Sequence, residues 1–270
     1  MNTDKETDLQ VRVALDGIVS TEYQQVKGGE WTVVDGGVPQ EAALSIYVNG
    51  FELATYMCMP RQQDALALGF LANEGLIASM DEVKVIHVCA RGTCADVWLS
   101  HAIERPSRSI VTSGCGGGLT FEDLSVQMEP LESCVRVTPG QVLGLMRQLY
   151  SAGQLYRTVR GIHTSALSDG ERLLLVAEDV GRHNTLDKLR GLALMQGIET
   201  RDRVLLSSGR VSSDMLVKAV RMGAPVVVSR TSPTSLSVAL ARAWGVTLIG
   251  YARAGRMNVY AGADRVRVGS

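Results

Sequence analysis

The segment VLLSSGRVSSDMLVKAVRMGAPVVVSRTSPTSLSVALARAWGVTLIGY, residues 204–251, decides the fold. It contains three short apolar runs rich in valine, leucine and isoleucine, which is typical of buried strands, at 204–207, 226–229 and 246–251. Two longer segments, 212–222 and 234–244, lie between these runs, and each is followed by a glycine, as at the end of a helix. Strands that alternate with helices indicate a largely parallel sheet with helices on its faces.

The region before this segment extends the same pattern. Strands are predicted at 161–166 and 173–177, and a helix is predicted from Gly181 to Met195. Thr138-Pro139 is a good helix start, because threonine caps the first free N–H groups and proline suits the first helical position. We therefore place a domain boundary here, with a C-terminal α/β domain over 138–270.

Residues 1–137 are predicted to form an N-terminal mixed β/α domain that ends in a glycine-rich loop around Cys115. Asn49-Gly50 between two apolar runs indicates a hairpin, because both residues tolerate positive φ. A helix is expected after Pro60, followed by a second hairpin with strands at 83–88 and 97–103. Between residues 20 and 40 the pattern is mixed, and only a short strand near Trp31 is expected. The fold class is α/β, or α+β for the whole chain.

The composition argues against a nucleic-acid-binding, membrane-spanning or exported protein. The 270 residues carry a formal net charge of −1, so no basic excess indicates nucleic-acid binding. The longest apolar runs are as short as strands, so no membrane span is expected. The first eight residues are polar and charged and lack the apolar core of a signal peptide, which favours a cytoplasmic protein.

The number and spacing of the five cysteines match neither a set of structural disulfides nor a metal site. An odd number in a cytoplasmic context argues against structural disulfides. Cys89 and Cys94 are separated by four residues and have no second close pair, so no metal site is expected. Cys58 and Cys134 are predicted to be core residues or partly buried thiols.

Cys115 differs from the others because it lies in the glycine run Ser113-Gly114-Cys115-Gly116-Gly117-Gly118. Glycine permits unusual backbone angles and leaves little steric cover, so a thiol here can move and can be reached. One interpretation is a reactive sulfur on a mobile loop. The other is a glycine-rich connector in which Cys115 has no role.

Arginines follow four successive predicted strands of the C-terminal half. They are Arg182, Arg210, Arg230, Arg253 and Arg256. Ligands of open α/β sheets bind beyond the carboxyl ends of the strands, and both helix N-termini and arginines favour phosphate. The pattern predicts a pocket for an anionic, phosphorylated ligand. Alternatively, each arginine pairs with a local acid on the surface.

His183 and Asp187 are four residues apart on one predicted helix and could share a face. His183 could then act as a general base beside Asp187 in a hydrolase or transferase of nucleotides. The alternative is local ion pairing at the start of the helix. No phosphate loop, nucleophile elbow or zinc-deaminase motif is present in the sequence.

Together these motifs resemble the FdhD family, the formate dehydrogenase accessory sulfurtransferases. The resemblance is carried by Ser113–Gly116, Glu178–Lys188, Ser207–Arg210 and Gly250–Arg256, in this order, and by the hairpin at Asn49-Gly50. It covers roughly residues 40–265. The resemblance implies a second domain of the cytidine deaminase type, with three α/β layers and without zinc.

The resemblance also implies a function. A cysteine desulfurase would load sulfur onto Cys115 as a persulfide, and the carrier would pass it to the molybdenum cofactor, a bis-molybdopterin guanine dinucleotide, before insertion into formate dehydrogenase. The positions matching the cofactor-binding segment are Tyr251, Ala252, Arg253, Ala254, Gly255 and Arg256. A homodimer is also implied by the family.

This sequence departs from the family pattern at one position. Many relatives have two cysteines in the loop, whereas Gly118 occupies the second position here. We therefore expect Cys115 to act alone, unless another cysteine assists. The two rival functions are a chaperone that binds the molybdenum cofactor without sulfur chemistry, and the nucleotide-acting enzyme that uses His183 and Asp187.

Overall fold

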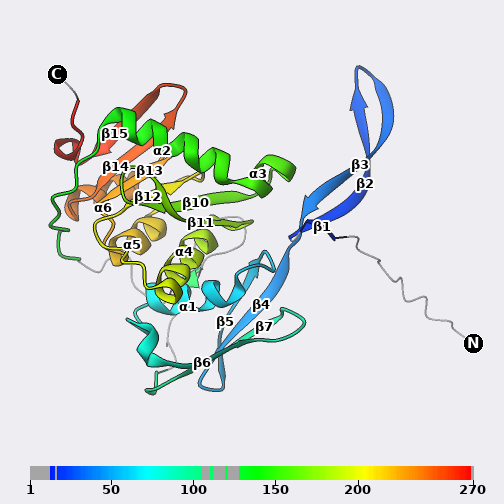
Figure 1. Ribbon diagram of the computed structural model, residues 1–270, viewed down its shortest axis with the longest axis horizontal. Helices are drawn as coiled ribbons and strands as arrows, with labels where there is room; N and C mark the ends of the chain where they lie inside the picture. The colour runs from blue at the N-terminus through cyan, green and yellow to red at the C-terminus, as the bar shows by residue number, and fades with distance from the viewer. Residues whose placement is uncertain (1–12, 16, 105–109, 112–118, 121–127, 269–270) are drawn as a thin grey trace, which may run out of the picture.

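The computed structural model describes residues 13–15, 17–104, 110–111, 119–120 and 128–268 (Figure 1). Cys115 and Gly118, and with them the predicted sulfur-carrying loop, lie outside the described residues. The described strands form sheets of three, six, four and two strands. The two-stranded sheet joins β8 (Ile110–Val111) to β9 (Leu119–Thr120), which come before and after Cys115 in the chain.

The six-stranded sheet forms the centre of the C-terminal half, in the order β11-β10-β12-β13-β14-β15. The strands are β10 (His163–Ser168), β11 (Leu173–Asp179), β12 (Val204–Ser207), β13 (Val226–Ser229), β14 (Thr247–Arg253) and β15 (Arg256–Ala261). All four residues of β12 and all four of β13 are buried, as expected for strands covered on both faces.

Helices cover both faces of this sheet, so the C-terminal half has three layers. On one face lies α2 (Pro139–Ala152), whose Leu145 packs with Val204 and Leu206. On the other face lie α4 (Arg182–Gln196), α5 (Ser213–Arg221) and α6 (Ser235–Ala243), where Leu205 belongs to the core. Neighbouring residues of β12 therefore enter opposite cores, as the two-residue period of a strand requires.

The helix boundaries follow the predicted signals. Thr138 accepts a hydrogen bond from the N–H of Gln141, whose side chain caps the N–H of Thr138 in return. The helix α4 ends at Gly197, which has φ of +64°, where glycine has little conformational penalty. The short α3 (Gln154–Val159) follows α2 directly.

The N-terminal half contains a four-stranded sheet in the order β5-β4-β7-β6. Its elements are β4 (Ala42–Val48), β5 (Phe51–Cys58), the 3-10 turn η1 (Met80–Glu82), β6 (Val83–Val88) and β7 (Cys94–Leu99). The helix α1 (Gln63–Asn73) packs Leu66 and Phe70 into a core with Leu44, Ile46 and Val97 of this sheet. The predicted hairpin at Asn49-Gly50 is confirmed, and β7 begins at Cys94 rather than at Val97.

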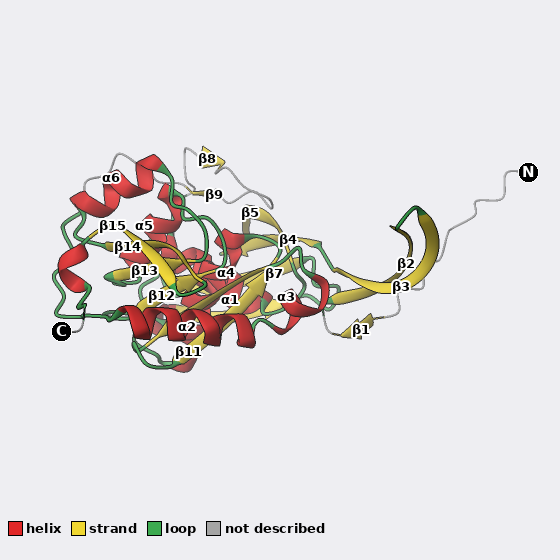
Figure 2. Ribbon diagram, turned by 90° about the horizontal axis from the view of Figure 1, so that it is seen from above, coloured by secondary structure: helices red, strands yellow, loops and turns green. Residues whose placement is uncertain are grey.

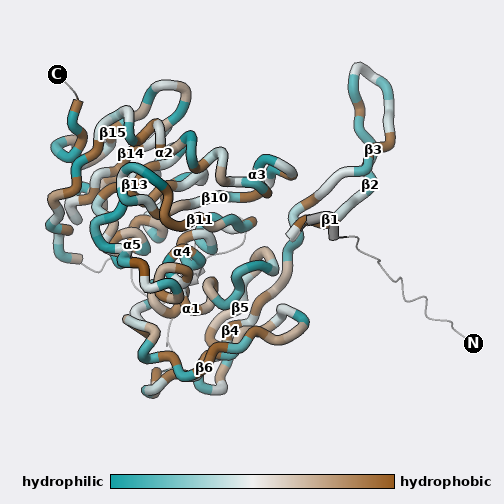
Figure 3. Tube along the Cα trace, viewed as in Figure 1, coloured by the Kyte–Doolittle hydropathy of each residue, from teal (hydrophilic) through white to brown (hydrophobic). Residues whose placement is uncertain are grey.

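Residues 18–39 form a long arm that the sequence did not predict. Its strands β2 (Ile18–Lys27) and β3 (Glu30–Pro39) pair antiparallel over their whole length, with the short β1 (Val13–Leu15) beside β2. Figures 1 and 2 both show the arm extending away from the two larger sheets. The tube of the arm is mostly pale to teal in Figure 3, and most of its residues are exposed.

The mixed α/β class is confirmed, but the expected largely parallel sheet is wrong. Among the described strands of the six-stranded sheet, only β12–β13 and β13–β14 pair parallel, whereas β10 pairs antiparallel with both β11 and β12, and β15 pairs antiparallel with β14. The physical reason is the connection length, because β10–β11 and β14–β15 are joined by turns too short for a parallel crossover.

The domain division at 137/138 stays a prediction. Residues on the N-terminal side of it already pack on the second half: the N–H of Leu131 donates to the carbonyl of Trp244, and Val137 bridges to Val266 beyond η2 (Ala263–Arg265). None of the described helices combines the length and the hydropathy that a membrane-spanning helix requires.

Candidate functional site

A cavity of about 490 Å³ opens where β13 and β14 end, in the size range of small-molecule sites. Among the described residues, the arginines that line it are Arg147 of α2, Arg230 after β13 and Arg253 of β14. Aromatic lining comes from Tyr150 of α2 and Tyr156 of α3. Cationic and aromatic groups around one cavity suit a ligand that carries both phosphates and a planar ring.

A hydrogen bond joins the two segments that carry Arg230 and Arg253. The N–H of Tyr251 donates to the carbonyl of Thr231 at 3.0 Å, which ties the end of β14 to the loop after β13. The Arg230 guanidinium lies 5.5 Å from the ring centroid of Tyr150, a cation–π distance. Arg230 is therefore held against α2, on the wall of the cavity.

The turn after β14 has an unusual backbone. Ala254 and Gly255 have φ of +51° and +77°, which is the pattern of a two-residue hairpin turn, and Tyr251 has φ of +52°. Residues other than glycine seldom occupy this region, and strained backbone often occurs at binding sites. Ala254 and Gly255 line the cavity, so the tight turn places backbone next to the ligand space.

Glu178, in the motif Glu178–Lys188, positions the other aromatic wall. Its carboxylate accepts hydrogen bonds from the N–H groups of Leu155 (3.2 Å) and Tyr156 (3.0 Å), at the start of α3. Thr164, a cavity residue, donates to the same carboxylate at 3.3 Å. Glu178 therefore fixes α3 against the strand β10 and holds Tyr156 at the cavity.

The structure brings together part of the predicted site. Arg230 and Arg253 reach the cavity as expected, whereas Arg182 is buried at the start of α4 and Arg210 and Arg256 are exposed. Of the segment Tyr251–Arg256, four residues line the cavity: Ala252, Arg253, Ala254 and Gly255. Arg147, Tyr150 and Tyr156 were missed, because no sequence signal tells which helix face borders a cavity.

The predicted pair of His183 and Asp187 is wrong. The Nε2 atom of His183 lies 2.5 Å from Oδ2 of Asp214 on α5, and both side chains are buried. Despite the opposing effect of burial, hydrogen bonding to His183 and the charge of its ring hold the pKa of the Asp214 carboxyl well below its usual range. Asp214 is therefore ionised at neutral pH, and His183 faces this carboxylate instead of Asp187.

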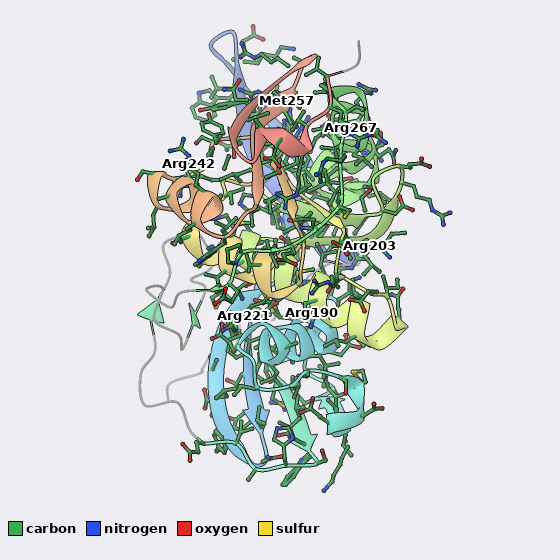
Figure 4. All side chains as sticks on the ribbon, turned by 90° about the vertical axis from the view of Figure 1, so that its left-hand side faces the viewer. Arg190, Arg203, Arg221, Arg242, Met257 and Arg267 are labelled. Atoms are coloured by element: carbon green, nitrogen blue, oxygen red, sulfur yellow. The ribbon has the colours of Figure 1, made fainter. Side chains whose placement is uncertain are left out.

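Asp187 belongs to a buried polar joint between the two halves of the chain. Its carboxylate accepts hydrogen bonds from Lys218 Nζ, at 2.5 Å and 2.7 Å, and from the side-chain amide of Asn73 on α1, at 2.7 Å. Arg221 donates to the carbonyl of Asn73. Figure 4 shows Arg221 where α1 meets the helices that cover the six-stranded sheet.

A second ion pair extends the joint. Lys188 Nζ lies 2.6 Å from Oδ2 of Asp179, and neither side chain is exposed. The same carboxylate accepts the N–H of Met59 at 3.1 Å, and Asn184 donates to the carbonyl of Met57 at 2.9 Å. Asp179, Asn184 and Asp187 of this motif thus join the two halves, and none of the three lines the cavity.

The described cysteines differ in their surroundings. Cys58 is buried, and burial raises the pKa of its thiol to about 12, so it is a core residue as predicted. Cys134 is exposed, contrary to the prediction. Within the described ranges, no group of three or more His, Cys, Asp and Glu side chains is arranged to hold a metal ion.

The chain is similar to known proteins over most of its length. Residues 39–267 match the model of the FdhD/NarQ family. It is 37% identical over 233 residues to the sulfur carrier protein FdhD of Staphylococcus aureus strain MRSA252, covering 84% of this chain and 88% of that protein. The protein of the same name from strain Newman is 36% identical over the same length.

A solved structure has the same fold. It is the crystal structure of a protein from Desulfotalea psychrophila described as a formate dehydrogenase accessory protein, with a TM-score of 0.80 and 26% sequence identity. The match covers 93% of this chain and 100% of that one. The family match, the identity to the staphylococcal proteins and the shared fold agree: the chain belongs to the FdhD/NarQ family.

Proposed function

We propose that this protein is a sulfur carrier for the molybdenum cofactor of formate dehydrogenase. The observation that carries the proposal is the cavity lined by Arg230, Arg253 and Tyr150, which suits a guanine nucleotide. The names of the relatives support it: sulfur carrier protein and formate dehydrogenase accessory protein. The proposed compartment is the cytoplasm, and two copies of the chain are proposed to associate.

The sulfur chemistry is assigned to Cys115. Its thiolate attacks the terminal sulfur of a cysteine desulfurase persulfide, so a new S–S bond forms on Cys115 and the desulfurase thiolate leaves. The S–S bond on Cys115 would then break, with Cys115 leaving as its thiolate, and the sulfane sulfur would pass to the substrate, bis-molybdopterin guanine dinucleotide, which would supply the two electrons that reduce it to sulfide. The cavity, which suits one nucleotide portion of this substrate, binds it while the reaction takes place.

The persulfide is tested by intact-protein mass spectrometry after incubation with a cysteine desulfurase and cysteine. The wild type should gain one sulfur atom that reductant removes, and Cys115→Ala should gain none while keeping its circular dichroism spectrum. Cys134→Ala, which removes an exposed thiol, is the matched control and should load normally. Loading that survives in Cys115→Ala would overturn the assignment, and no loading of the wild type by an active desulfurase would favour a chaperone that only binds the cofactor.

Nucleotide binding should depend on the arginines of the cavity. Removing Arg253 deletes a charge-assisted contact to phosphate worth about 1.5–3 kcal/mol, so Arg253→Ala should weaken the binding of guanosine diphosphate about tenfold or more. Isothermal titration calorimetry measures the dissociation constant. Arg242→Ala, which removes an exposed arginine of α6 (Figure 4), should bind like the wild type. Equal affinities of the three proteins would place the nucleotide elsewhere.

A further inference from the structure

We propose that Cys89 and Cys94 form a redox-active dithiol that reacts with low-molecular-weight disulfides, with Cys89 as the attacking thiol and Cys94 as the resolving thiol. The two residues flank the turn between β6 and β7 of the four-stranded sheet, and neither lines the cavity. This reactivity does not depend on the sulfur transfer proposed for Cys115.

The hairpin places both side chains on one face of the sheet. Val88 pairs with Ala95, so the next pair outward is Cys89 and Cys94, with side chains on the face opposite Val88 and Ala95. The N–H of Cys89 donates to the carbonyl of Cys94 at 3.0 Å, and the N–H of Cys94 donates to the sulfur of Cys89 at 3.1 Å. The two residues are therefore direct neighbours across the hairpin.

The surroundings of the two sulfur atoms differ, and the difference assigns their roles. Hydrogen bonds from the Cys94 thiol and from Thr93 lower the pKa of Cys89 to about 6. The same contact between the thiols raises the pKa of Cys94. The N–H of Cys94 lies 3.1 Å from the Cys89 sulfur and the hydroxyl of Thr93 lies 3.5 Å from it, and both favour the nucleophilic thiolate on Cys89.

The turn is accessible and is also held in place. Both cysteines are partly exposed, so a small disulfide can reach them. The amide of Gln63, at the start of α1, donates to the carbonyl of Gly92 at 2.7 Å. The N–H of Ser45 on β4 donates to the carbonyl of Thr93 at 2.9 Å. These contacts hold the turn, and with it the two cysteines, in a fixed position before the reaction.

The reaction is a balanced thiol–disulfide exchange. The Cys89 thiolate attacks one sulfur of a small disulfide, forms a mixed disulfide and releases one small thiolate. Cys94 then loses its proton and attacks the Cys89 sulfur, which forms the Cys89–Cys94 bond and releases the second thiolate. Two protein thiols are oxidised by two electrons, and the small disulfide is reduced to two thiols.

Peptide mapping tests this directly, because trypsin cuts after Arg91, between the two cysteines. The reduced full-length protein is incubated with oxidised glutathione at pH 7, quenched, alkylated and digested without reductant. In the wild type, the peptide Val85–Arg91 should remain joined to the peptide that begins at Gly92. Cys94→Ser should instead retain glutathione on Cys89, because the resolving thiol is absent.

Two further variants separate this proposal from general thiol oxidation. Cys134→Ser should form the linked peptides as readily as the wild type, and Cys89→Ser should form none. The pH of half-maximal alkylation of Cys89 by iodoacetamide should rise in Cys94→Ala, which lacks the donor thiol. Separate glutathione adducts on both cysteines of the wild type, or an unmodified Cys89 in Cys94→Ser, would overturn the proposal.

Discussion

Lys218→Met should lower the free energy of unfolding by about 3–5 kcal/mol. Methionine has nearly the length of lysine and fills the same space, but it leaves the buried carboxylate of Asp187 without its cation. Of the donors described above, only the amide of Asn73 then remains on that carboxylate. Chemical denaturation followed by circular dichroism measures the loss.

Two controls separate the loss of the charge pair from other effects. Lys84→Met removes an exposed lysine of β6 and should change stability by less than about 0.5 kcal/mol. The double variant Lys218→Met/Asp187→Asn should be more stable than Lys218→Met alone, because no unpaired charge is left buried. A single variant as stable as the wild type would show that water reaches Asp187.

Gly69→Ala should destabilise the protein by about 3 kcal/mol or more. The helices α1 and α4 approach so closely that a Cβ on Gly69 would overlap the backbone carbonyl of Asp187. In the same way, a Cβ on Gly191 of α4 would overlap the backbone carbonyl of Ala65. Backbone atoms cannot rotate aside like a side chain, so the helices would have to separate, and the joint around Asp187 would be disturbed.

Gly144→Ala is the matched control for this substitution. Gly144 lies within α2, where a Cβ would meet only ordinary contact with Arg147 at 3.7 Å. Alanine is the better helix former, so this variant should be as stable as the wild type or up to about 1 kcal/mol more stable. Thermal unfolding of both variants separates the effect of close packing from that of helix propensity. A Gly69→Ala variant that unfolds at the same temperature as the wild type would contradict the close approach of α1 and α4.

Local signals were sufficient to predict most of the C-terminal elements. The helix α4 has a glycine at its end, and Thr138-Pro139 marks the start of α2, so both were predicted near their observed positions. The arm was missed because β2 and β3 are exposed on both faces and therefore lack a strict alternation of apolar and polar residues. β15 was missed because the turn before it, at Ala254-Gly255, has no asparagine or aspartate.

Residues of the candidate site could be predicted from the sequence only where the order of the strands in the sheet determines where they lie. Arg230 directly follows β13 and Arg253 ends β14, so their position at one edge of the sheet could be expected from two neighbouring parallel strands. Asp187 finds its partners on α1 and α5, and Arg147 borders the cavity from α2. These contacts depend on how helices pack over the sheet, which helical periodicity alone does not determine.

The joint also bears on how the protein is made. Synthesis proceeds from the N-terminus, and Asn73 leaves the ribosome 114 residues before Asp187. Until then, the face of α1 with Gly69 and Asn73 has no partner from α4 to cover it. The packing of α1 is therefore completed late, and a nascent chain that stalls before α4 presents an uncovered helix to chaperones and proteases.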